Sequence, residues 1–129
     1  MSDNHNQPFG ELVLDSENGL IKIFYGPDSK IEDWKKSLGE LLEVSEKTGI
    51  YRVLIDVRKQ KKLADTLALF NFGSHLPTHL SFAVLIELHQ EEHRFIENVA
   101  VNRGITVKGF TSEQEATDWL MQIPNRQTG

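Results

Sequence analysis

The segment His89-Gln90-Glu91-Glu92-His93 has a spacing that zinc hydrolases use. Histidines four residues apart share one helix face, where both can bind a metal ion while a glutamate activates water. A hydrolase of this kind takes a further acidic ligand from a helix well downstream, yet only 36 residues follow His93, and most of them are needed for the core. We therefore predict no metal centre, no cofactor and no enzyme here. We interpret the motif as a solvated surface at a helix start, with incidental divalent-metal binding as the alternative.

A second candidate is the basic segment Arg58-Lys59-Gln60-Lys61-Lys62, which holds four positive charges in five residues. It follows a predicted buried strand and precedes a predicted helix that opens at Asp65 and Thr66. Open α/β sheets bind ligands at the carboxyl end of their strands, and the amides of a helix N-terminus favour anions. Charge runs are usually solvated loops. The alternative is a surface for an anionic ligand or an acidic partner, formed by Arg58, Lys59, Lys61, Lys62, Asp65 and Thr66.

Three other polar side chains are candidate site residues. Asp56 ends the same buried strand, and we interpret it as an acceptor for the amides of the following loop rather than as a catalytic carboxylate. His75 and His79 can titrate near neutral pH, but no companion spacing supports a metal site. The sequence contains no G-x-x-x-x-G-K or G-x-G-x-x-G motif, which argues against a nucleotide-dependent enzyme.

Composition sets the frame for these candidates. The 129 residues are 39% hydrophobic and 26% charged, which predicts one globular domain over residues 1–129 with flexible ends at 1–7 and 125–129. The absence of cysteine excludes disulfides and cysteine nucleophiles, and we expect a cytoplasmic protein. A net charge of −5 disfavours broad binding to nucleic acid or anionic membranes. The longest apolar run, Phe82 to Ile86, is too short for stable membrane insertion.

The elements that position these residues follow from hydrophobic periodicity. Residues 9–15 and 20–25 are β-prone runs around an Asn-Gly turn and predict a hairpin. A helix follows from a capping box of Ser29 and Glu32 to Gly49. Residues 53–56, 81–88 and 105–110 are predicted strands, and 66–75, 90–103 and 112–123 predicted helices. The fold class is therefore α/β: a five-stranded, mostly parallel sheet with an N-terminal antiparallel hairpin strand and four helices.

The predicted helix over residues 66–75 is apolar around more of its circumference than one core contact can bury. Leu67, Phe70 and Phe72 form either an exposed apolar surface or the lining of a pocket. We predict that the protein self-associates through this helix, as a homodimer.

This element order resembles the SpoIIAA-like family, bacterial relatives of the STAS domain (sulfate transporter and anti-sigma factor antagonist). The segments that carry the resemblance are Val53-Leu54-Ile55-Asp56 and Gly109-Phe110-Thr111-Ser112-Glu113-Gln114-Glu115-Ala116-Thr117-Asp118-Trp119-Leu120. It covers Phe9 to Ile123 and implies a non-enzymatic regulatory or protein-interaction module.

Anti-sigma factor antagonists carry Asp-Ser-Ser at a helix N-terminus, with the second serine phosphorylated. The matching residues here are Asp65, Thr66 and Leu67, so the resemblance implies interaction without a matching phosphoserine. Thr66 still offers a hydroxyl beside the helix start. Comparison of the family with CRAL-TRIO domains implies the alternative function, binding of a small apolar or lipid-like ligand.

Overall fold

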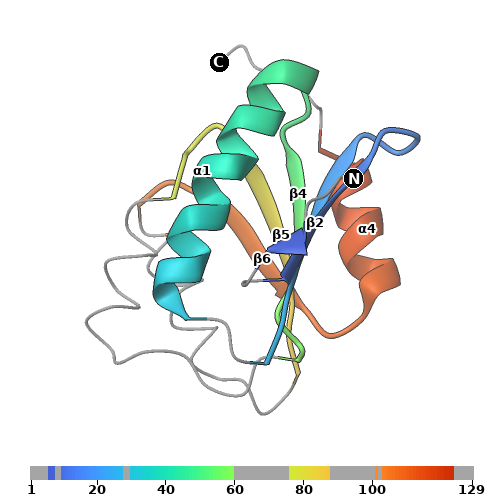
Figure 1. The fold of residues 1–129 in the computed structure, drawn as a ribbon. Helices are drawn as coiled ribbons and strands as arrows, with labels where there is room; N and C mark the ends of the chain where they lie inside the picture. Colours follow the sequence, from blue (N-terminus) through green and yellow to red (C-terminus); the bar gives the residue numbers. More distant parts are fainter. Residues whose placement is uncertain are drawn as a thin grey trace.

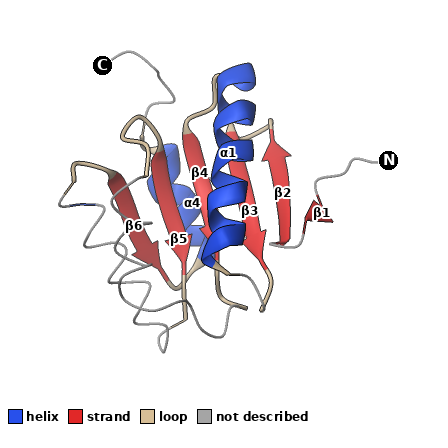
Figure 2. Ribbon diagram, turned by 60° about the vertical axis from the view of Figure 1, so that its left-hand side comes forward, coloured by secondary structure: helices blue, strands red, loops and turns tan. Residues whose placement is uncertain are grey.

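The computed structural model describes residues 6–7, 10–27, 30–59, 76–87, 101 and 103–123. They form one sheet in which the spatial order of the strands equals their order along the chain (Figure 2). The strands are β1 (Asn6–Gln7), β2 (Gly10–Asp15), β3 (Leu20–Tyr25), β4 (Arg52–Asp56), β5 (Ser81–Leu85) and β6 (Thr106–Phe110). The helices within the described residues are α1 (Ile31–Thr48) and α4 (Glu113–Met121).

The predicted α/β class is confirmed. The strands β3, β4, β5 and β6 are mutually parallel, and β2 pairs with β3 antiparallel. Strands β2 to β6 are the five predicted ones, and the two-residue β1 adds a sixth that the sequence pattern did not indicate. Two of the four predicted helices correspond to α1 and α4. The segments predicted as the other two, 66–75 and 90–103, lie outside the described residues apart from 101 and 103.

The β2–β3 hairpin follows the predicted boundaries closely. Its loop is held by the Asp15 carboxylate, which accepts hydrogen bonds from the Asn18 backbone N–H at 3.2 Å and from Asn18 Nδ2 at 3.0 Å. These bonds lower the pKa of Asp15. Within the predicted Asn-Gly turn, only Gly19 has a positive φ, +68°. The four-residue loop turns with Asn18 at negative φ because the Asp15 carboxylate supports the turn.

Helix α1 begins one residue later than predicted. Its N-cap is Lys30, not Ser29, and the Lys30 backbone N–H donates to the Asp33 carboxylate at 2.9 Å. Asp33 therefore takes the role expected of Glu32. The helix ends as predicted at Gly49, where a φ of +75° lets the Gly49 N–H reach the Ser45 carbonyl at 2.8 Å.

Side chains alternate between the two faces of the sheet and make two apolar layers. On the α1 side, Ile21, Val53 and Phe82 are buried in one cluster with residues of the helix. On the α4 side, Leu54, Leu85 and other strand residues pack in a second cluster with Ala116 and Leu120. Figures 1 and 2 show the two helices on opposite faces of the sheet. The central strands β4 and β5 are thus covered on both sides, as their nearly continuous apolar sequences predict.

Buried polar groups on the α1 side hydrogen-bond to one another. The Tyr25 hydroxyl bonds to the Ser37 hydroxyl, which donates to the Trp34 carbonyl at 2.8 Å, and the rings of Tyr25 and Trp34 stack at 5.0 Å. Burial raises the pKa of Tyr25 well above its ordinary value.

Among the described residues, no helix has the length and apolar character needed to cross a membrane.

Candidate functional site

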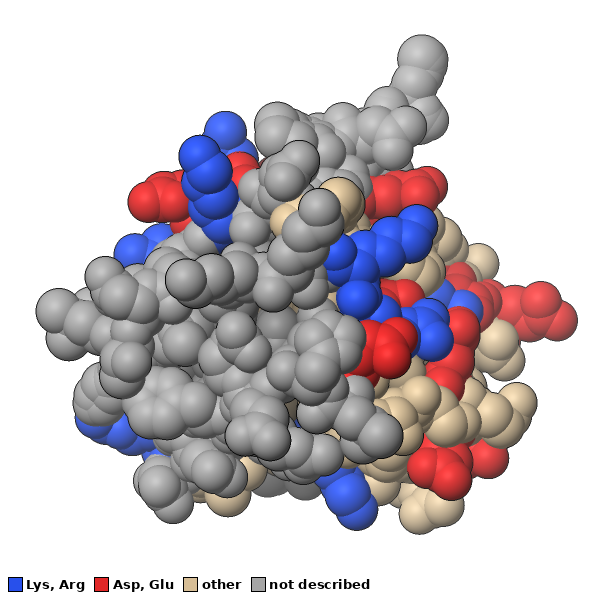
Figure 3. Space-filling model, turned by 90° about the horizontal axis from the view of Figure 1, so that it is seen from below, with Lys and Arg blue, Asp and Glu red and all other residues tan. Residues whose placement is uncertain are grey.

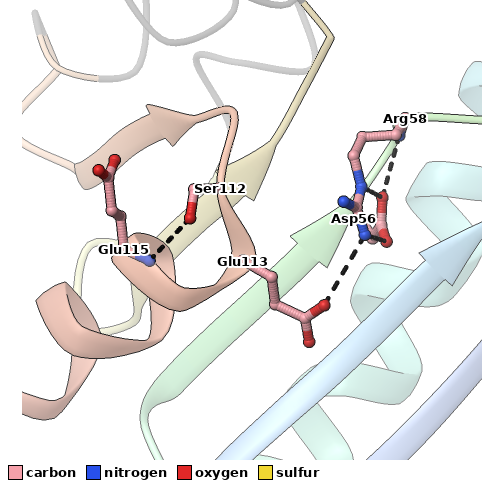
Figure 4. A network of polar contacts seen from close by, with 5 residues as sticks. All are labelled: Asp56, Arg58, Ser112, Glu113 and Glu115. Carbon is pink, nitrogen blue, oxygen red and sulfur yellow. Dashed lines mark hydrogen bonds and ion pairs between the residues drawn. The ribbon is translucent and has the colours of Figure 1, made fainter.

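Among the described residues at the carboxyl end of the parallel strands, Asp56, the last residue of β4, makes several hydrogen bonds to one neighbour, Arg58. Its carboxylate holds Arg58 in three ways (Figure 4): Oδ1 accepts from the Arg58 backbone N–H at 3.0 Å and from Nε at 3.0 Å, and Oδ2 accepts from Nη2 at 2.8 Å. The last two contacts form a bidentate pair, the strongest geometry for a guanidinium and a carboxylate. The predicted interpretation of Asp56 as an acceptor for a loop amide is confirmed.

The end of β4 and the turn that follows it explain why these two side chains meet. Val57 is fully buried in the α1-side cluster, and its N–H donates to the Leu85 carbonyl at 3.0 Å, which continues the pairing of β4 with β5. Because neighbouring side chains of a strand point to opposite faces, Asp56 projects toward the α4 side. Arg58 lies in the turn after the strand, where its backbone N–H and its side chain both return to the Asp56 carboxylate.

Helix α4 supplies a second acidic group to this cluster. Glu113 is the first residue of α4, and its Oε1 lies 3.8 Å from Arg58 Nη2 (Figure 4). The N-cap Ser112 accepts a hydrogen bond from the Glu115 N–H at 3.3 Å, which fixes the first turn of this helix. Glu87, just beyond β5, adds to the negative potential around the guanidinium. Arg58 thus links the end of β4 to the start of α4.

The charge of Arg58 is therefore largely compensated inside the protein. Its hydrogen bonds to Asp56 come first among the interactions that raise the pKa of Arg58. The side chain is 34% exposed, while that of Asp56 is only 13% exposed. Figure 3 looks onto the end of the molecule where the parallel strands finish, and its coloured part shows basic and acidic side chains next to one another. On this part of the surface, positive charge is interleaved with negative charge.

The structure describes two of the predicted site residues of the basic segment. Arg58 is paired with Asp56, and Lys59 is exposed directly after it. The remaining members of the predicted surfaces lie outside the described residues: Lys61, Lys62, Asp65, Thr66, Leu67, Phe70 and Phe72. Their roles stay predictions.

The histidine candidates separate in the same way. His89, His93 and His75 lie outside the described residues. His79 is exposed and meets the Tyr51 ring edge-on, with 5.6 Å between ring centroids. No three His, Asp or Glu side chains of the described part of the chain are grouped so that they could hold a metal ion.

Two connections were missed by sequence reasoning. Glu113 lies 55 positions after Arg58, and no local sequence pattern predicts that the two side chains meet. Arg52, at the start of β4, makes contacts at the other end of this strand. Its Nε donates to the Ile123 carbonyl, just after α4, at 2.7 Å, and its Nη1 approaches the Asn18 carbonyl at 3.5 Å. Arg52 and Arg58 thus tie β4 to the two ends of α4.

Comparison with known proteins gives no independent guide to the role of these residues: no family model, no curated protein and no solved structure matches the chain.

Proposed function

We propose that the protein is a non-enzymatic interaction module that binds an acidic surface of a regulatory partner through the lysines of its basic segment, residues 58–62. The observation that carries this proposal is the position of the segment's first residues. Val57 is buried and hydrogen-bonded to β5, Arg58 is fixed to Asp56, and Lys59 then emerges exposed at the carboxyl end of the sheet. Ligands of open α/β sheets bind outside this end of the strands.

Engagement of Asp56 supports an interaction role over catalysis. Both carboxylate oxygens accept hydrogen bonds from Arg58. A general base needs a free oxygen aimed at a substrate proton, and a carboxylate in a bidentate pair with arginine is a poor one. The residue that the sequence offered as a catalytic carboxylate instead supports the loop that follows it.

The proposal is tested by fluorescence anisotropy with a labelled peptide of twelve glutamates as the acidic probe. The triple variant Lys59→Gln, Lys61→Gln, Lys62→Gln should bind about tenfold more weakly, since three lysine charges at about 0.5 kcal/mol each give about 1.5 kcal/mol.

The matched control removes the same charge at three exposed cations away from the carboxyl end of the sheet, in the triple variant Lys47→Gln, Arg103→Gln, Lys108→Gln. It should retain affinity within about twofold, because Lys47 and Arg103 lie at the opposite, amino end of the parallel strands and Lys108 lies in the middle of β6. Equal losses in the triple variant and the control would reduce the effect to net charge and overturn the proposal.

A further inference from the structure

We propose that Arg58 is a positioning residue for the basic segment: it fixes the point from which Lys59 leaves the sheet and does not itself bind the acidic partner. This proposal rests on the proposed function. It assigns different roles to neighbouring cations that look equivalent in the sequence, with binding charge supplied by the lysines and geometry supplied by the arginine.

The contacts of the guanidinium carry this assignment. Of its three nitrogens, Nε and Nη2 donate to Asp56 at 3.0 and 2.8 Å. Nη2 also faces Glu113 at 3.8 Å. An acidic group from a partner that approached Nη1 would be repelled by the carboxylates of Asp56 and Glu113, which already neutralise the guanidinium from within the same chain. Arg58 is therefore poorly placed to bind another anion.

The same contacts fix the backbone at the start of the segment. The Arg58 N–H donates to Asp56 while its side chain returns to the same carboxylate, so the main chain and the side chain close a compact ring around one group. Lysine cannot reproduce this arrangement, because an ammonium is a single point donor without the planar fork of a guanidinium. A charge-conserving substitution should therefore lose the positioning.

The glutamate-peptide assay separates positioning from direct binding through Arg58→Lys and Arg58→Gln. If Arg58 positions the segment, both variants should weaken binding by a similar factor, about threefold, and both should keep the wild-type dependence of affinity on salt. If Arg58 binds the peptide, Arg58→Lys should retain wild-type affinity. Arg58→Gln should then show a shallower salt dependence, as is expected of Lys59→Gln, because fewer cations meet the polyanion.

Asp56→Asn gives a second and opposite test. The variant removes one negative charge beside the binding surface and releases Arg58 from its bidentate pair. If Arg58 were a binding cation held back by Asp56, this variant should bind the acidic peptide more tightly. If Arg58 positions the segment, the variant should bind no more tightly than wild type, in spite of the more favourable net charge.

Far-UV circular dichroism at the assay temperature shows whether each variant is folded. If one of the variants Asp56→Asn and Arg58→Lys does not fold, the other still tests the proposal. Retained affinity in Arg58→Lys, or tighter binding by Asp56→Asn, overturns the positioning role alone and leaves the proposed function standing. Absence of peptide binding by the wild-type protein at millimolar concentration overturns both.

Discussion

The ion pair between Asp56 and Arg58 should make a measurable contribution to stability. Asp56→Asn keeps an oxygen that can accept the Arg58 backbone N–H, while it removes the charge and one of the two acceptors for the guanidinium. Arg58→Gln removes the guanidinium and leaves the backbone bond. A double-mutant cycle of these substitutions therefore isolates the contact between the two side chains.

The magnitude follows from the burial of the pair. Hydrogen bonds to charged groups contribute about 1.5–3 kcal/mol when buried, and exposed ion pairs about 0.2–1 kcal/mol. With Asp56 at 13% and Arg58 at 34% side-chain exposure, the pair lies between these limits, and we expect a coupling energy of about 1 kcal/mol.

Urea denaturation at low ionic strength is the appropriate assay, because guanidinium chloride would itself screen the charges. All four proteins of the cycle must unfold in one transition with equal m-values. A coupling energy below about 0.3 kcal/mol, within the usual error of additivity, would refute the interpretation of this contact as a fixed anchor.

Three further outcomes are expected. Gly49→Ala should destabilise the protein by about 1 kcal/mol, because the alanine must adopt a φ of +75°. Gly39→Ala lies in the exposed middle of α1 with open space for a methyl group, and it should instead stabilise the protein by about 0.5–1 kcal/mol. Thermal denaturation in which both variants shift the melting temperature in the same direction would contradict this. Above pH 10.0, the ordinary pKa of tyrosine, Tyr25 ionises in the unfolded state but stays neutral in the folded state. The stability of the wild type should therefore fall with rising pH by up to about 1.4 kcal/mol per pH unit relative to Tyr25→Phe. Parallel stability profiles of the two proteins above pH 10 would contradict this prediction. The predicted homodimer should appear in sedimentation equilibrium, and a 14.7 kDa monomer at about 100 μM would exclude it.

The strands and the two described helices were predictable because their signals are local. The apolar runs of β4 and β5 indicated strands buried on both faces, and Gly49 marked the end of α1 through a conformation that glycine adopts readily. The exact start of α1 was not predictable in the same way. The N-cap is Lys30, whose backbone N–H donates to the carboxylate of Asp33, one residue after Glu32; lysine is not among the residue types that mark an N-cap in a sequence.

The polar cluster was only half accessible from the sequence. Asp56 ends β4 and Arg58 lies in the turn directly after it, so their pairing could have been inferred from the expected bond between the Asp56 carboxylate and the loop amides. The contact with Glu113 could not, because it depends on how α4 is set against the carboxyl end of the sheet. Treating the four cations of the basic segment as equivalent ignored both neighbours, and the charge of Arg58 was overcounted for that reason.

The proposed binding surface is tested most directly by titrating ¹⁵N-labelled protein with the twelve-glutamate peptide and mapping the amide shift changes in heteronuclear NMR spectra. We predict that among the described residues the largest changes fall at Arg58 and Lys59 and at the neighbouring Glu87 and Glu113. The opposite end of β4, around Arg52, should change little. Changes confined to the exposed lysines of α1, or no changes at millimolar peptide, would contradict the proposal that the carboxyl end of the sheet binds an acidic partner.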